Sequence, residues 1–370
     1  VGSEMCIRDR IEPKQGVYDE NEIEHYRKVL TCCRENGVEP IVTMMHFTSP
    51  KWLIENGGWE NEATVEAFKN YCQYVTEQLG DLMHYVCTIN EANMGIQVAA
   101  ISARYRAQMM AKMQRMQQGG AEEKKDLEGT AQVGMNFNDM MANMQKQKEE
   151  NVEIFGTDTL QTFVSARTPE GDMLVIRAHQ AARAAMKAVK PELQIGLTLS
   201  LHDIQAQEGG EETAAKEWVD EFTHYVPYIK EDDFFGLQNY SRSLIGPNGI
   251  LPVPEGAEIT QMDYEYYPEG LEHVIRRVYE EMPMPIMVTE NGIATADDTR
   301  RVAYIQTAMK GVENCIQDGI PVKGYMYWSM MDNFEWQKGF GMTFGLISVD
   351  RTTQTRTAKP SLTVLGNYTK

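Results

Sequence analysis

Two carboxylates, far apart in the chain, each come at the end of a short apolar segment. Glu91 ends the segment YVCTINE, and Glu290 ends the segment PIMVTE. Short apolar runs of this kind are typical of buried strands, and two strands that end side by side would bring the two acids together. A pair of carboxylates is the minimum that cleavage of a glycosidic bond requires. The segment from Trp328 to Trp336 adds aromatic faces and a further acid, which suits a sugar ligand.

Composition and charge exclude several classes of protein. The chain has 370 residues, enough for one large domain or two ordinary ones, and its net charge of −19 argues against a nucleic-acid partner. It contains no run of about 18 apolar residues, so no membrane-spanning helix is expected, and its N-terminal residues lack the apolar core of a secretory signal. The six cysteines include no CxxC pair, which favours reduced thiols and a cytoplasmic location.

Alternating strands and helices must position the acids. We expect strands at residues 38–45, 83–89, 194–200, 234–238, 285–289 and 322–327, and helices at residues 64–79, 173–189, 271–281 and 299–317. Strands separated by helices indicate βα units and a parallel sheet. Nearly every strand ends at a residue capable of chemistry. A (β/α)8 TIM barrel gathers all its strand ends at one face, whereas a doubly wound sheet uses mainly its switch point, so the α/β fold that we predict is the barrel.

The sequence shows six of the eight strands that such a barrel contains. The two that should precede Arg10 are absent, and residues 1–9 do not resemble either of them. We therefore expect residues 1–9 to be foreign to the fold. Residues 10–370 would form a single catalytic domain of the (β/α)8 type that lacks its first two strands, with open edges on the strands that flank the gap.

A segment at residues 104–150 departs from the alternation of strands and helices. It is rich in Met, Gln, Lys and Glu, and Met109, Met110, Met113 and Met116 fall at helical spacing. A stripe of methionines is more typical of flexible apolar packing than of a cofactor site. We expect this Met-rich insert to form helices beside or over the mouth of the active site.

Several motifs along the chain point to one family. They are RIEP and GVYD between residues 10 and 19, HF with Pro50 and Leu53, TINE at residues 88–91, VTENG at residues 288–292, and the stretch from Trp328 to Asp350. In type, order and spacing they resemble glycoside hydrolase family 1, the family of β-glucosidases, from Arg10 to Tyr368. Ala92 replaces the proline of the family's T-x-N-E-P motif, which would leave the turn that aims Glu91 looser.

The resemblance implies a retaining reaction with a separate role for each acid. Glu91 would be the general acid/base, whose pKa must be raised so that it can protonate the leaving oxygen. Glu290 would be the nucleophile, and Tyr240 resembles the tyrosine whose hydroxyl orients the nucleophile. In retaining enzymes the two carboxyl groups lie about 5–5.5 Å apart.

The resemblance also assigns the binding of the sugar. The residues that it implies are His46, Asn90, Trp328, Glu335, Trp336 and Phe344. Asn90 would bond the 2-hydroxyl, His46, Glu335 and Trp336 would bond other hydroxyls, and Trp328 and Phe344 would line the sugar with apolar faces. Family members that act on 6-phosphoglycosides carry a serine at the position of Glu335. A carboxylate there would repel a phosphate, which favours a non-phosphorylated sugar.

We therefore expect a β-glucosidase that releases terminal non-reducing β-D-glucosyl residues from small β-glucosides or short β-linked oligosaccharides. The resemblance implies no metal or organic cofactor, and the charge and the lack of a long apolar run argue against a nucleic acid or a membrane as a partner. Two alternatives stay open: a β-galactosidase or other β-glycosidase of the same family, and an inactive sugar-binding fragment. The second arises because the family's glutamine from the first strand and arginine from the second have no counterpart here. Aglycone preference and oligomeric state also stay open.

Overall fold

The strands expected from the sequence form a parallel sheet in the computed structural model, which describes residues 10–117, 137–155 and 160–369. The parallel strands are β1 (Ile41–Met45), β2 (Tyr85–Ile89), β3 (Gln194–Gly196), β4 (Thr198–Ser200), β6 (Phe235–Gln238), β9 (Ile286–Asn291) and β10 (Val322–Tyr327). They pair in the orders β1-β2-β3 and β4-β6-β9-β10. The order in space follows the order along the chain, as the strands of a barrel do.

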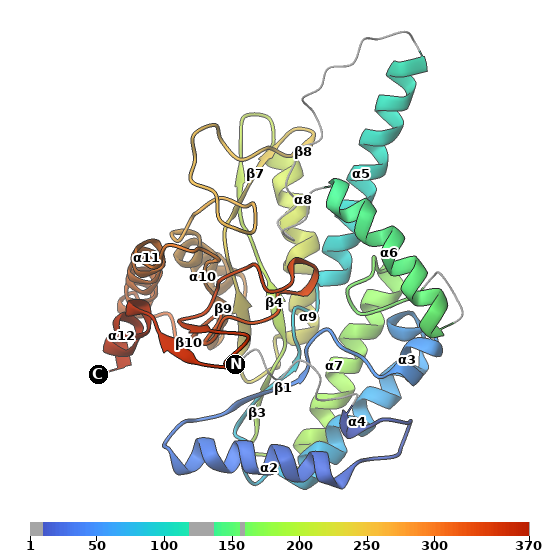
Figure 1. Ribbon diagram of the computed structural model, residues 1–370, viewed down its shortest axis with the longest axis vertical. Coiled ribbons are helices and arrows are strands. Elements are labelled where there is room, and N and C mark those ends of the chain that lie inside the picture. Colours follow the sequence, from blue (N-terminus) through green and yellow to red (C-terminus); the bar gives the residue numbers. More distant parts are fainter. Residues whose placement is uncertain (1–9, 118–136, 156–159, 370) are drawn as a thin grey trace.

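Helices cover the outside of this sheet (Figure 1). They are α2 (Glu20–Glu35), α3 (Lys51–Glu55), α4 (Ala63–Leu79), α5 (Met94–Gln117), α6 (Phe137–Phe155), α7 (Pro169–Val189), α8 (Glu211–Glu221), α9 (Val226–Ile229), α10 (Gly270–Glu281), α11 (Asp298–Gln317) and α12 (Pro360–Gly366). Helix α4 shows how the pattern determines packing, because the predicted apolar face at Phe68, Tyr71, Val75 and Leu79 is the face that it buries.

One predicted strand is broken in two. The segment at residues 194–200 is interrupted at Leu197, so that β3 pairs with β2 and β4 pairs with β6. The Leu197 N–H donates to Asp232 Oδ2 at 3.1 Å instead of to a neighbouring strand. This carboxylate, which precedes β6, lets the strand change partners without leaving the buried amide unpaired.

The sheet is open on one side. Within the described residues β1 pairs along the barrel only with β2, and β10 only with β9. The side chains of β10 are partly or largely exposed along the whole strand, whereas most of those of its neighbour β9 are buried. The edge strands predicted from the sequence are therefore observed at β1 and β10.

Two small additional sheets flank the strand ends, and the sequence patterns did not predict them. Strands β5 (Asp203–Ala206), β7 (Arg242–Gly246) and β8 (Gly249–Ile250) form one sheet in the order β5-β7-β8. Strands β11 (Ile347–Val349) and β12 (Arg356–Ala358) form a hairpin beyond β10. Because β5 and β7 begin just past β4 and β6, the first sheet rises directly from the strand ends that carry the site.

The helices expected in the Met-rich insert are present on both sides of residues 118–136, which lie outside the described residues. Helix α5 runs away from the sheet, and α6 returns toward α3 (Figure 1). There the Lys51 ammonium lies 5.4 Å from the centre of the Phe155 ring. Met110 is 67% exposed, so it does not pack as the stripe predicted, and the side chains of the other three methionines of the stripe lie outside the description.

Candidate active site

Three acids meet at the C-terminal ends of the parallel strands. Glu91 follows β2 and is 6% exposed, Glu290 lies near the end of β9 and is 8% exposed, and Glu335 comes from the loop after β10. The charges of Glu290 and Glu335 both act on Glu91, and that of Glu335 acts on Glu290, so the three carboxyl groups lie close together. The structure thus brings together the acids that the sequence analysis singled out.

The surroundings of Glu91 and Glu290 differ in a way that separates their ionisation. Burial, followed by the negative charges of Glu290 and Glu335, raises the pKa of Glu91 well above its usual range. Burial also raises the pKa of Glu290 to about 7, but there the Tyr240 hydroxyl opposes the rise. That hydroxyl donates to Glu290 Oε2 at 2.5 Å. Glu91 is therefore held protonated and Glu290 has its anion stabilised, which is the division that an acid and a nucleophile require.

Asn90 is buried between the acids and several polar side chains. Its Oδ1 accepts from Gln238 Nε2 at 2.7 Å, and its amide nitrogen lies 3.2 Å from His46 Nε2. A hydrogen bond from Asn90 also lowers the pKa of Glu290. Burial lowers the pKa of His46 to about 4, so this imidazole is neutral at pH 7 and offers one donor and one acceptor.

Aromatic rings line the space around His46. Its ring centre lies 5.9 Å from that of Trp328 and 6.1 Å from that of Trp336. Phe344 is 3% exposed and meets the Tyr240 ring edge to face, with 6.1 Å between the centres. All three predicted aromatic residues are therefore near His46 or Tyr240, although they come from a single segment after β10.

Glu335 presents an acceptor that the described protein leaves unpaired. Burial raises its pKa to about 7, and a hydrogen bond from Trp328 opposes that rise. Its Oε2 is buried and has no hydrogen-bond partner within the described residues. A buried oxygen of this kind costs free energy unless a ligand supplies a donor, and sugar hydroxyls are such donors.

Sequence reasoning missed several residues of the site. Ser200 bonds the Glu91 carboxyl, and Gln238 holds Asn90. Tyr264 is 6% exposed and packs in one cluster with Phe344 and Trp328. Ser200 and Gln238 could have been found, because both end strands. Tyr264 lies in a loop, where no periodic pattern marked it.

The turn after Glu91 is more constrained than the sequence suggested. The Ala92 N–H donates to Thr198 O at 3.0 Å, a bond that proline could not make. On the opposite side, Ala92 O accepts from the Arg167 guanidinium at 2.8 Å. Both backbone groups of Ala92 are thus hydrogen-bonded, and these bonds restrict the turn in the absence of a proline ring.

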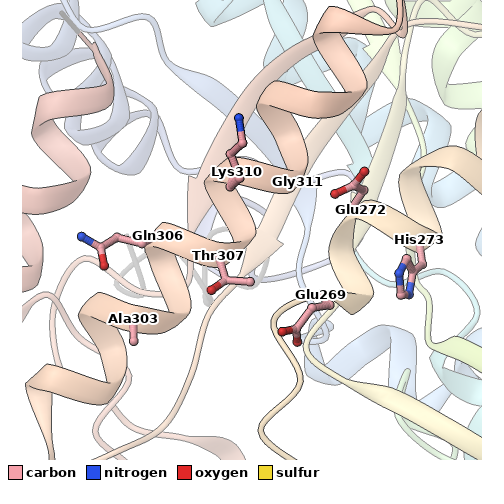
Figure 2. A pocket seen from close by; sticks show the side chains of 8 residues that line it. All are labelled: Glu269, Glu272, His273, Ala303, Gln306, Thr307, Lys310 and Gly311. Atoms are coloured by element: carbon pink, nitrogen blue, oxygen red, sulfur yellow. The ribbon is translucent and has the colours of Figure 1, made fainter.

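A separate hollow of about 420 Å³ lies between α10 and α11, away from the three acids. Figure 2 shows side chains of both helices around it, among them Glu272, His273 and Lys310. None of the residues proposed for catalysis lines it. Neither here nor in any other described part of the chain are three or more His, Cys, Asp or Glu side chains arranged to hold a metal ion. No described helix is long and apolar enough to cross a membrane.

Comparison with known proteins decides the family. The model of glycosyl hydrolase family 1 matches residues 8–117 and 230–368. The chain belongs to glycosyl hydrolase family 1. Similar proteins include a β-galactosidase from Pyrococcus woesei, which is 25% identical over 94% of this chain and 72% of its own length. A β-glucosidase from Agrobacterium sp. is 26% identical over 94% of this chain and 75% of its own length.

Solved structures confirm the fold over nearly the whole chain. A β-glycosidase that is 41% identical superposes with a TM-score of 0.79. The match covers 97% of this chain and 79% of the chain of that β-glycosidase. A β-glucosidase solved without ligand is 35% identical and superposes with a TM-score of 0.82. The match covers 98% of this chain and 82% of that structure's chain. The (β/α)8 TIM-barrel class predicted from the sequence is thus confirmed for this family 1 glycosidase, whose parallel strands pair in the orders β1-β2-β3 and β4-β6-β9-β10.

Proposed function

We propose that this family 1 glycosidase is a retaining β-glucosidase that uses Glu290 as nucleophile and Glu91 as general acid/base. The observation that carries the proposal is the asymmetry of the buried pair. The Tyr240 hydroxyl, 2.5 Å from Glu290 Oε2, favours the anion of Glu290. Glu91 has two neighbouring negative charges that favour its protonated form. Each acid is therefore prepared for a different role in the reaction.

The reaction proceeds in two displacements. Tyr240 occupies Glu290 Oε2, which leaves Oε1 to attack the anomeric carbon while Glu91 gives its proton to the departing glycosidic oxygen. A glycosyl–enzyme ester results, and the negative charge that Glu290 carried is lost. Because that charge had raised the pKa of Glu91, the pKa of Glu91 falls, and Glu91 becomes able to accept a proton from the water that hydrolyses the ester.

The sugar itself is bound by polar groups around the two acids and by aromatic faces. Asn90, held by Gln238, bonds the 2-hydroxyl, a contact that strengthens in the transition state. His46, Glu335 and Trp336 bond the remaining hydroxyls, with the unpaired Glu335 Oε2 as the main acceptor. Trp328 and Phe344 supply the apolar wall.

The glycone is a non-phosphorylated hexose. A 6-phospho-β-galactosidase from Lacticaseibacillus casei is 25% identical to this chain, so phosphorylated substrates occur among relatives. The argument against them here is Glu335, whose carboxylate would repel a phosphate, and which has no cation among the groups that shift its pKa. Glucose is proposed ahead of galactose; the similarity to a β-galactosidase keeps galactose as the second candidate.

A panel of 4-nitrophenyl β-glycosides tests the proposal. We expect the highest kcat/KM for the β-glucoside, a lower value for the β-galactoside, and no turnover of the α-glucoside or of the 6-phosphoglucoside. The sugar released first should be the β-anomer, detectable by proton NMR before mutarotation. Release of the α-anomer would refute the retaining mechanism, and a preference for the galactoside would replace the glucosidase by the second candidate.

A further inference from the structure

The backbone at Glu91 has a conformation that needs support. Its φ is 44°, in the left-handed region that residues with a side chain rarely adopt. Such a conformation persists only where surrounding contacts impose it, and it is common at catalytic positions. The direction of the Glu91 side chain therefore depends on whatever holds the turn at residues 90–92.

Thr198, in β4, provides two acceptors for that turn. The Glu91 N–H donates to Thr198 Oγ1 at 3.0 Å, and the Ala92 N–H donates to Thr198 O at 3.0 Å. The same hydroxyl lies 3.3 Å from Asn90 Oδ1 and 3.2 Å from Ile89 O, to which it can donate. Thr198 is 1% exposed, so both bonds are buried away from bulk solvent.

The residues that follow continue this attachment to β4. Asn93 Nδ2 donates to Ser200 O at 2.7 Å, and Asn93 Oδ1 accepts from the Ser200 N–H at 3.0 Å. The Asn93 side-chain amide thus makes the same pair of hydrogen bonds with the backbone of Ser200 that a neighbouring strand would make. Gln97 Nε2 adds a bond to the same carbonyl at 2.8 Å.

Arg167 holds the opposite side of the turn. Its guanidinium donates to Ala92 O, and its backbone N–H donates to Gly95 O at 3.1 Å. The guanidinium is itself fixed, because it donates to Phe163 O at 2.9 Å and lies 4.5 Å from the centre of the Phe163 ring. The turn is consequently held between β4 and a buried arginine.

We propose that Thr198 is a positioning residue for the acid/base: its hydroxyl and carbonyl oxygens hold the Glu91–Ala92 turn in the geometry that aims the Glu91 carboxyl at the leaving oxygen. This inference rests on the proposed role of Glu91. It explains why alanine at position 92 is compatible with an ordered turn. The Ala92 N–H, which a proline would lack, is used to bind Thr198 O.

The test compares Thr198→Val, which keeps the shape and removes the hydroxyl, with Thr198→Ser, which keeps the hydroxyl. Thr76→Val is the matched control, because Thr76 is also buried and its hydroxyl donates to Cys72 O within its own helix, α4. Displacing a catalytic group by about 1 Å can cost about 100-fold in rate. We expect Thr198→Val to lower kcat/KM about 10- to 100-fold for phenyl β-glucoside, and much less for the 2,4-dinitrophenyl glucoside, whose leaving group needs no proton.

Added azide should restore part of the activity lost on the dinitrophenyl substrate, and Thr198→Ser should behave nearly as the unmodified chain does. An equal loss on both substrates, or a matching loss in Thr76→Val, would overturn the proposal. Crystal structures of the unmodified chain and of Thr198→Val give a readout that does not depend on turnover. An unmoved Glu91 carboxyl would refute the positioning role even if no glycoside is hydrolysed. Absence of turnover in the unmodified chain would instead refute the proposed function.

Discussion

Replacement of Tyr240 by phenylalanine tests the electrostatic argument for Glu290. The tyrosine hydroxyl donates to Glu290 Oε2 at 2.5 Å in a buried setting and lowers the pKa of that acid. A hydrogen bond to a charged group is worth about 1.5–3 kcal/mol, and about 1.4 kcal/mol corresponds to one pKa unit. Since the bond favours the ionised form, its loss must raise the pKa of Glu290.

The nucleophile must be ionised to attack, so the acidic limb of the profile of kcat/KM against pH reports its pKa. We expect Tyr240→Phe to move this limb upward by about one to two pH units and to lower kcat/KM near pH 6 about 10- to 100-fold. The alkaline limb, which reports Glu91, should move little. The assay is hydrolysis of phenyl β-glucoside, whose leaving group needs the proton of Glu91, from pH 4 to pH 9.

Tyr266→Phe serves as the control, because its hydroxyl donates to a backbone carbonyl, Arg300 O, at 3.2 Å. It should leave both limbs in place. An unshifted acidic limb in Tyr240→Phe, or a shift to lower pH, would refute the account of how Glu290 is kept ionised.

Two further substitutions address the other acids. Glu91→Ala should lower turnover of substrates with poor leaving groups about 10²- to 10⁴-fold, and added azide should restore the second step and yield a β-glycosyl azide; equal losses for all leaving groups, without rescue, would count against the acid/base role. Glu335→Gln should raise KM for the glucoside about tenfold or more, because a buried acceptor for sugar hydroxyls loses its charge. It should also shift both limbs of the pH profile to lower pH, since the Glu335 charge raises the pKa of Glu91 and of Glu290; unchanged limbs would show that Glu335 lies too far away to act on them.

The sequence was informative where a local pattern alone determines structure. Continuous apolar runs predicted β2 and β9, because strands buried on both faces have that pattern, and the acids at their ends were found with them. Helix α7 begins at Pro169 rather than at residue 173. The cue for this earlier start is Thr168, whose side chain caps the helix by accepting from the Gly171 N–H, with proline at the first helical position.

The sequence was uninformative where a role depends on contacts between distant segments. Thr198 and Glu91 are 107 positions apart, and nothing near either residue indicates that one binds the other. The break between β3 and β4 depends in the same way on Asp232, a residue from a different βα unit. The bonds that restrict the turn at Ala92 could not be predicted for the same reason, since they come from Thr198 and Arg167.

The most direct test of the central claim is covalent labelling of the nucleophile. Incubation of the chain with 2,4-dinitrophenyl 2-deoxy-2-fluoro-β-glucoside should trap the glycosyl–enzyme, because the fluorine slows hydrolysis of the ester. The proposal predicts one label per molecule, on the peptide that contains Glu290, with no label in Glu290→Gln. A label on Glu91, Glu335 or another residue would contradict it, as would turnover of ordinary glucosides without any covalent adduct.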